Sequence, residues 1–201
     1  MIVRQIRVGT MQNFVYLVAD KLGNEALVID SGWETGPIIS AAREAGVKVK
    51  LAVATHNHFD HTSTLTELTG ALGAKVVAHE RSPIDHDVSV KGGDVLRVGQ
   101  NEVKVIYTPG HTSDSICLYD GNNIFTGDTL FIGNCGRTDL PGGSTEEMFR
   151  SLHDVILKLP PSTTIFPGHD YGDVPFRKLG EEALSNPTLS ARTYAEFLRV
   201  P

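Results

Sequence analysis

Short apolar runs and polar turns alternate along the chain, and the apolar runs form two groups of predicted strands, each followed by predicted helices. We expect strands at residues 3–8, 14–19, 25–30, 51–54, 75–78, 95–98, 103–107, 116–119, 124–125 and 163–166. We expect helices at residues 38–45, 62–72 and 144–159, and over most of 176–198. Pro37 and Gly46 mark the start and the C-cap of the first helix, and Ser144 with Glu147 forms a capping box for the third.

Two runs of strands with helices after each favour an α/β fold in which two sheets pack face to face and helices cover their outer sides. No internal repeat and no linker rich in serine, proline or charge divides the 201 residues, so we expect one domain over residues 1–201. A chain of this length buries roughly 70% of its unfolded surface. It can therefore fold without disulfides, and its two cysteines, Cys117 and Cys135, do not make a disulfide framework.

The composition narrows the class of partner. Hydrophobic residues make up 40% of the chain and charged residues 21%, which excludes a disordered chain. The formal net charge of −6 disfavours nucleic-acid binding, because proteins that hold phosphate backbones are usually basic. No apolar stretch approaches the ~20 residues of a membrane span, and the first residues lack the apolar core of a signal peptide. We expect a cytoplasmic protein without nucleic-acid or membrane partners, and the sequence allows a homo-oligomer.

The segment Thr55–His61 places three histidines and an aspartate directly after a buried strand. Burial of unpaired polar groups costs several kcal/mol each, so core packing does not explain this composition. In an extended loop His56 and His58 point to the same side, and Asp60 with His61 can face a second ion beside the first. Imidazole and carboxylate ligands suit zinc, iron or manganese, and the absence of cysteine disfavours a closed structural zinc site. The spacing H-x-H-x-D-H therefore predicts metal binding.

Three further side chains of the ligand type follow predicted strands. His111 and His169 each come after a strand and a Pro-Gly pair, and Asp128 comes after a strand and a glycine. The end of a strand is where a rigid scaffold meets a free loop, and binding residues concentrate there. We expect these three residues to join the histidine segment in one site.

With these residues in this order, nearly the whole chain resembles the metallo-β-lactamase superfamily. The resemblance implies a four-layer αββα sandwich with two metal ions at one edge between the sheets. It implies a first metal held by His56, His58 and His111, and a second held by Asp60, His61 and His169, with Asp128 bridging the two. Asp60 has an implied catalytic role, because an oxygen left free by the metal would orient the nucleophile and shuttle a proton.

Residues 131–139 and His169-Asp170-Tyr171 resemble the glyoxalase II and persulfide dioxygenase branch of that superfamily. The resemblance implies that Arg137 reaches the carboxylate or thiol part of a small-molecule substrate and that Tyr171 lines the same pocket. A salt bridge between Arg137 and Asp139 is the alternative explanation for that arginine, and we weigh the two evenly. Cys135 is interpreted as a small packing residue. The histidines outside the pattern are interpreted as surface or core residues: His79, His86 and His153.

The first functional hypothesis is a metallo-hydrolase similar to glyoxalase II. Two divalent ions, drawn from zinc, iron and manganese, would supply a hydroxide that cleaves a thioester of the hydroxyacyl-thiol type. The segment after His169 is shorter than the helical domain that grips glutathione in full-length glyoxalase II, and Thr138-Asp139 replaces the aromatic residues usual there. The resemblance therefore points to a smaller thiol or to another acyl substrate.

The second hypothesis is a persulfide dioxygenase with one Fe(II). Such enzymes resemble this chain at residues 136–139 and 169–171, and at Asn186-Pro187 and Leu189 ahead of Glu196-Phe197. The resemblance implies an iron held by His56, His111 and Asp128, a facial triad with open positions. A lactonase-type hydrolase is a further alternative, and a non-catalytic metal-stabilised module is the alternative that is not an enzyme. The complete set of seven ligands favours the hydrolase.

Overall fold

The computed structural model describes residues 1–20, 22 and 24–200, and within them two six-stranded sheets pack against each other. The first sheet has the order β1-β2-β3-β4-β5-β6 and contains β1 (Ile2–Val8), β2 (Asn13–Ala19), β3 (Glu25–Ile29), β4 (Lys48–Val53), β5 (Lys75–His79) and β6 (Val88–Val90). The second has the order β12-β11-β10-β9-β8-β7 and contains β7 (Val95–Val98), β8 (Asn101–Tyr107), β9 (Ile116–Tyr119), β10 (Asn123–Gly127), β11 (Thr164–Pro167) and β12 (Arg177–Lys178). Both sheets are mixed, as the parallel pairing of β3 with β4 and of β10 with β11 shows.

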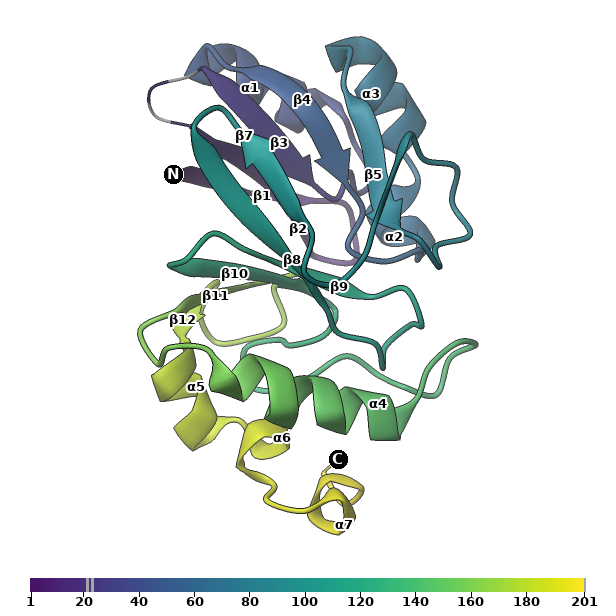
Figure 1. The fold of residues 1–201 in the computed structure, drawn as a ribbon, viewed down its shortest axis with the longest axis vertical. Coiled ribbons are helices and arrows are strands. Elements are labelled where there is room, and N and C mark those ends of the chain that lie inside the picture. The colour runs from purple at the N-terminus through teal and green to yellow at the C-terminus, as the bar shows by residue number, and fades with distance from the viewer. Residues whose placement is uncertain (21, 23, 201) are drawn as a thin grey trace.

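Helices cover the outer face of each sheet, so the predicted αββα layering is confirmed (Figure 1). The helices near the first sheet are α1 (Gly36–Ala45), α2 (Phe59–Thr62) and α3 (Leu65–Leu72). Those at the opposite end are α4 (Thr145–Arg150), its continuation through the wider turn η1 (Ser151–Val155) and the tighter turn η2 (Ile156–Lys158), then α5 (Leu179–Ser185), α6 (Pro187–Ser190) and α7 (Tyr194–Phe197). The central apolar cluster lies between the sheets, and Tyr16 and Phe125 are among its largest members.

Most predicted elements lie where the sequence places them, and the differences have local causes. Gly46 caps α1 in the left-handed conformation, and the Ser144 hydroxyl accepts the Glu147 N–H at the start of α4. The single helix predicted over 62–72 is wrong, because the chain forms α2 and α3 with a break between them. At that break the Ser63 and Thr64 hydroxyls donate to backbone carbonyls of the loop before α1, including Gly32 O.

Two short strands, β6 and β12, are absent from the prediction, since three and two residues carry too little alternation to be recognised. β4 also begins at Lys48, before the predicted position 51. The predicted helical stretch at 176–198 is three short helices, and Pro187 begins α6 directly after α5 ends. In the part of the chain that the structure describes, no helix is both long enough and apolar enough to cross a membrane.

The topology brings several strand ends to one edge of the sandwich. The carboxyl ends of β3 and β4 lie together because these strands are parallel, and the same holds for β10 and β11 in the other sheet. Backbone hydrogen bonds then join the sheets at this edge: Phe14 N–H donates to Gly168 O at 2.8 Å, and Ile116 N–H donates to Thr55 O at 2.9 Å. The loops that follow β3, β4, β10 and β11 therefore converge on one small volume.

Candidate metal centre

Seven histidine and aspartate side chains from loops and one short helix meet at this edge. His56 and His58 come from the loop after β4, and Asp60 and His61 from α2. The other three follow β8, β10 and β11: His111, Asp128 and His169. All but His58 are buried, and His58 is half-buried. The structure thus brings together every ligand-type residue that the sequence selects.

Four of the histidine rings are held by a hydrogen bond from Nδ1, which turns Nε2 toward the centre of the cluster. Nδ1 of His111 donates to Arg137 O at 2.7 Å, and Nδ1 of His169 donates to Met11 O at 2.9 Å. A carbonyl oxygen can only accept, so Nδ1 carries the proton in both rings and Nε2 is free to bind a cation.

The other two rings are held through one buried carboxylate. Nδ1 of His61 lies 2.8 Å from Asp30 Oδ2. Nδ1 of His56 lies 3.0 Å from Thr55 Oγ1, and that hydroxyl donates to Asp30 Oδ2 at 2.9 Å. The Thr55 hydroxyl therefore accepts from His56, and the Nε2 atoms of both rings face the cluster. Outer partners of this kind fix the tautomer and orientation of metal-binding histidines.

The ligand atoms form three overlapping groups, in each of which they lie within 4.8 Å of one another. These groups are His56, His58 and His111; His56, His61 and Asp128; and Asp60, His61 and His169. The carboxylate of Asp128 lies between them: Oδ1 is 3.2 Å from His61 Nε2, and Oδ2 is 3.5 Å from His111 Nε2 and 3.4 Å from His169 Nε2.

Among the described residues, two buried atoms of this cluster, His56 Nε2 and Asp128 Oδ1, lack a hydrogen bond of good geometry, although Asp128 Oδ1 lies 3.2 Å from His61 Nε2. A buried nitrogen or oxygen without a partner is costly, and a cation bound at the centre would satisfy both atoms. Nε2 of His111 accepts from Nδ1 of His58 at 2.9 Å, and a bound cation would take the place of that proton between the two rings. The residues present therefore fit one or two metal ions, and their chemistry suits zinc or iron.

The pKa values of the histidines differ between the two sides of the cluster. Burial lowers the pKa of the His56 imidazole, and the neighbouring His61 lowers it further. Burial also lowers the pKa of His58, and His111 adds to the shift. These rings are neutral at pH 7 and ready to bind a cation.

On the other side, carboxylates outweigh the effect of burial. Burial alone would lower the pKa of His61, but Asp128 and Asp30 raise it well above its usual value. Burial likewise opposes the charge on His169, yet hydrogen bonds to Asp128 and Asp60 raise its pKa to about 9. Without a metal, a proton shared between these two rings, whose Nε2 atoms lie 3.1 Å apart, therefore balances part of the charge of the buried carboxylates.

The sequence does not predict the residues that orient the ligand-type side chains from outside the cluster. Asn13 Nδ2 donates to Asp60 Oδ2 at 2.9 Å, and Asn13 Oδ1 accepts from Trp33 Nε1 at 2.9 Å. Asp30 and Thr55 have the role described above. The sequence marks these residues only weakly. Each of the polar ones lies beside or at the end of a predicted strand, where a turn residue is also expected.

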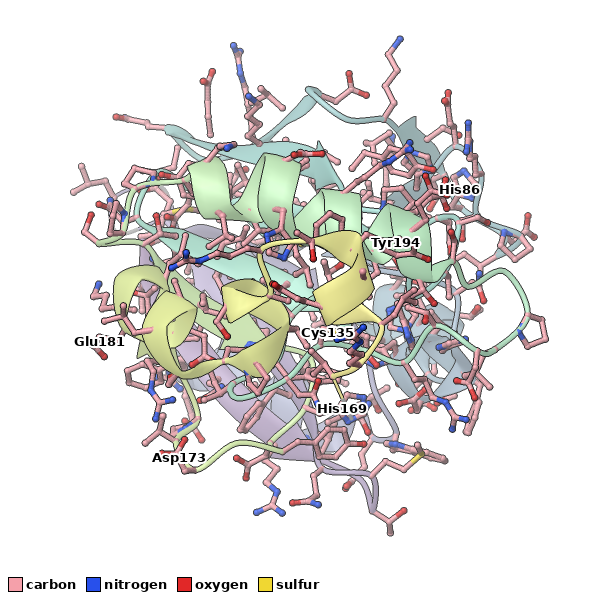
Figure 2. The ribbon with its side chains drawn as sticks, turned by 90° about the horizontal axis from the view of Figure 1, so that it is seen from below. His86, Cys135, His169, Asp173, Glu181 and Tyr194 are labelled. Atoms are coloured by element: carbon pink, nitrogen blue, oxygen red, sulfur yellow. The ribbon has the colours of Figure 1, made fainter. Side chains whose placement is uncertain are left out.

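A cavity of about 750 Å³ opens onto the cluster. Phe131 and Tyr171 form part of its wall, and the Tyr171 ring stacks on His169 with 4.6 Å between ring centroids. Arg137 also lines the cavity, and its guanidinium binds Asp139 through two contacts of 2.7 Å, so the structure contains the salt bridge that the sequence allowed. Cys135 is half-buried at the cavity, on the same side of the molecule as His169 (Figure 2).

The remaining three histidines lie outside the cluster. His79 stacks on Tyr107 and His153 stacks on Phe149, with 4.4 and 4.3 Å between ring centroids. His86 binds Ile84 O at 2.7 Å and lies at the periphery of the molecule, far from His169 in Figure 2. Their interpretation as surface or core residues agrees with these positions.

Several known proteins are similar to this chain in sequence or in fold. The model of the metallo-beta-lactamase superfamily matches residues 8–169. Persulfide dioxygenase ETHE1 of Homo sapiens is 33% identical, over 99% of this chain and 80% of that protein. Hydroxyacylglutathione hydrolase of Cereibacter sphaeroides (strain ATCC 17023) is 39% identical, over 79% of this chain and 63% of that protein. The crystal structure of ETHE1 from Myxococcus xanthus has a TM-score of 0.93 at 33% identity, and the match covers 100% of this chain and 92% of that one.

Proposed function

From the premise that the chain belongs to the metallo-β-lactamase superfamily and is a metallo-enzyme, we propose that it is a persulfide dioxygenase, which oxidises the terminal sulfur of a small thiol persulfide with O₂. The observation that carries the proposal is the extent of the likeness. ETHE1 of Myxococcus xanthus matches the whole chain, including the helices after His169, whereas the hydroxyacylglutathione hydrolase match covers 63% of that protein. This extent outweighs the preference for a hydrolase that the sequence motifs suggest.

In this proposal three residues would hold a single iron: His56, His111 and Asp128. Iron(II) bound by two imidazoles and a carboxylate keeps coordination positions open for O₂ and for a thiol derivative. The hydrogen bonds from His111 to Arg137 O and from His56 to Thr55 fix the two rings. Their Nε2 atoms are therefore already oriented to bind the cation.

Asp60 is the proposed proton acceptor. Among the described residues, its contacts to Asn13, His61 and His169 all use Oδ2, which leaves Oδ1 to take a proton from a bound thiol derivative. The aromatic wall at Phe131 and Tyr171 excludes water from one side of the substrate. Arg137 at the same cavity offers a guanidinium to a substrate carboxylate, in competition with Asp139.

A thioester hydrolase is the second candidate, because Asp128 faces ligand groups on both sides of the cluster. Two ions at such a site lower the pKa of a shared water toward neutrality and polarise a carbonyl. In that case the second ion would be held by Asp60, His61 and His169.

Metal analysis combined with oxygen uptake tests the proposal. Protein purified without added metal is analysed for zinc, iron and manganese, and is then given glutathione persulfide in an oxygen electrode and a glutathione thioester in a spectrophotometer. We expect one iron per chain and rapid oxygen uptake. Two ions per chain, thioester cleavage and no oxygen uptake would overturn the dioxygenase in favour of the hydrolase.

A matched pair of histidine variants separates the same two candidates. His111→Ala removes a ligand in both mechanisms and should abolish turnover. His58→Ala removes a ligand only in the two-metal mechanism, so a dioxygenase should keep iron and measurable oxygen uptake. Loss of all iron from His58→Ala would contradict the facial triad.

A further inference from the structure

One wall of the cavity is the turn Phe131–Asn134, and all four of its residues line the cavity. The Phe131 ring meets His169 and Tyr171 edge to face, with 5.7 and 5.4 Å between ring centroids. Gly133 has φ +85°, in the left-handed region that glycine adopts without strain. One backbone hydrogen bond closes the turn, from Phe131 N–H to Asn134 O at 2.9 Å, and the Phe131 and Ile132 side chains are buried; further polar contacts also hold the turn beside His169.

Those contacts come from two side chains of the C-terminal helices, Glu182 and Asn186, both fully buried. The Gly133 N–H donates to Glu182 Oε1 at 2.5 Å. Asn186 Nδ2 donates to Asn134 O at 3.1 Å and to Phe131 O at 3.3 Å, and it also reaches Glu182 Oε1 at 2.9 Å. Glu182 and Asn186 thus bind three backbone groups of a four-residue turn, and we call these two side chains the clasp.

Arg177 and Thr188 orient the two side chains of the clasp. Arg177 Nη1 donates to Glu182 Oε2 at 3.1 Å, which compensates the buried carboxylate. The other oxygen, Oε1, is thereby left to the turn. Asn186 Oδ1 accepts from the Thr188 N–H at 2.9 Å and from the Thr188 hydroxyl at 2.6 Å, which orients its amide nitrogen toward the turn.

We propose that Glu182 and Asn186 are positioning residues for the substrate: through the clasp they set the distance between the Phe131–Asn134 wall and the metal cluster. The inference rests on the proposed function only in that a substrate occupies this cavity. Among the described residues, no hydrogen bond or ion pair joins either side chain to the seven ligand-type residues, so we expect their effect on substrate binding rather than on metal binding. Displacement of a cavity wall by about 1 Å costs up to about 100-fold in rate.

Two substitutions of one residue separate positioning from general stability. Glu182→Gln keeps an oxygen for the Gly133 N–H but loses the charge that pairs with Arg177. Glu182→Ala removes both interactions. Glu181→Ala is the matched control, because Glu181 is the neighbouring residue of α5, is exposed and lies at the periphery of the molecule in Figure 2.

The first readout is amide hydrogen exchange at Gly133, which does not depend on activity. We expect exchange at Gly133 to accelerate by about tenfold or more in Glu182→Ala, because the N–H loses its acceptor oxygen. Exchange should stay near the wild-type rate in Glu182→Gln and in Glu181→Ala.

The second readout is the split between KM and kcat for whichever substrate, persulfide or thioester, the wild type turns over. In Glu182→Ala we expect KM to rise by about tenfold with metal content unchanged, and in Glu182→Gln we expect KM within about threefold of wild type. A merely structural role would lower the stability of both variants and leave the KM of the folded protein unchanged.

The outcomes distinguish this proposal from the function it serves. If Glu182→Ala has wild-type exchange at Gly133 and wild-type KM, or if Glu182→Gln behaves like Glu182→Ala, the clasp is wrong. If the wild type turns over neither substrate but Gly133 exchange follows the pattern above, the clasp stands and the proposed function fails. If Glu182→Ala does not fold, Asn186→Ser takes its place, since it removes the donor to the Phe131 and Asn134 carbonyls and should raise Gly133 exchange and KM in the same way.

Discussion

Replacing Asp30 with asparagine tests how the histidine rings are held. Asp30 is only 2% exposed, and its carboxylate accepts from the Thr55 N–H at 2.8 Å, from the Thr55 hydroxyl at 2.9 Å and from His61 Nδ1 at 2.8 Å. Its φ is +60°, a conformation that asparagine tolerates as readily as aspartate. The substitution therefore changes the chemistry of the side chain and not the preference of the backbone.

The expected loss of stability and of metal affinity follows from the number of hydrogen-bond donors around position 30. An amide has one oxygen and one NH₂ group, so at least one of the three donors around position 30 then faces another donor. Each charged hydrogen bond that is lost costs about 1.5–3 kcal/mol of unfolding free energy. Loss of the partner at Nδ1 also frees the His61 ring, and loss of such outer partners weakens metal binding by about 10–100-fold. We expect both effects in Asp30→Asn.

The assay is a metal titration against a competing chelator, together with urea unfolding of the metal-free protein. Asp20→Asn is the matched control: Asp20 is 4% exposed and accepts from Gln100 N–H at 3.0 Å and from Asn101 Nδ2 at 2.8 Å. It follows the far end of β2, about 23 Å from Asn13 along the strand. The control should lose stability and keep its metal affinity. Wild-type metal affinity in Asp30→Asn, or an equal loss in both variants, would refute the reasoning.

Three further predictions concern the walls and the charge of the site. Gly168→Ala should lose metal and activity, because its Cβ would lie 2.5 Å from Asp128 Oδ1; Gly70→Ala, with open space around it in α3, should fold with unchanged metal content. Affinity for a second ion at Asp60, His61 and His169 should rise with pH up to about 9, because His169 must release a proton to bind it and its pKa is raised to about 9; calorimetry in buffers of different ionisation enthalpy measures the protons released. Arg137→Leu should raise KM for a carboxylated thiol derivative with little change in Tm, since a fully exposed ion pair adds little to stability.

The sequence selects ligand-type residues that the structure brings together, because they follow strands that the apolar pattern predicts. His111 and His169 come after Pro-Gly turns, and the segment from His56 to His61 comes after β4. Once the strand order makes β3 and β4, and β10 and β11, parallel neighbours, these ends must meet. The layers of the fold follow from the same pattern. Apolar residues recur at about every second position on the buried face of a strand and about every 3.6 positions on that of a helix, so the two kinds of element can be told apart.

The residues behind the site could not be predicted in the same way. Asp30 and Asn13 each make several buried contacts, yet in sequence they are single polar residues beside a strand, where a turn explains them equally well. Their role depends on partners 31 and 47 positions away, and no local pattern encodes such separations. Glu182 and Asn186 are hidden for a related reason: on a short amphipathic helix, polar residues are expected to face solvent, and these two are fully buried.

We propose that the choice between dioxygenase and hydrolase depends on this second kind of residue. The seven ligand-type side chains serve either reaction, so they cannot separate the two candidates by themselves. The turn Phe131–Asn134 is held by residues that follow the last ligand, His169, in sequence. The segment that extends the likeness to ETHE1 beyond His169 is therefore the segment that shapes the substrate wall. If the clasp sets KM as proposed, substrate preference in this chain is determined by α5 and the residues around Asn186, while the metal loops supply reactivity common to both enzymes.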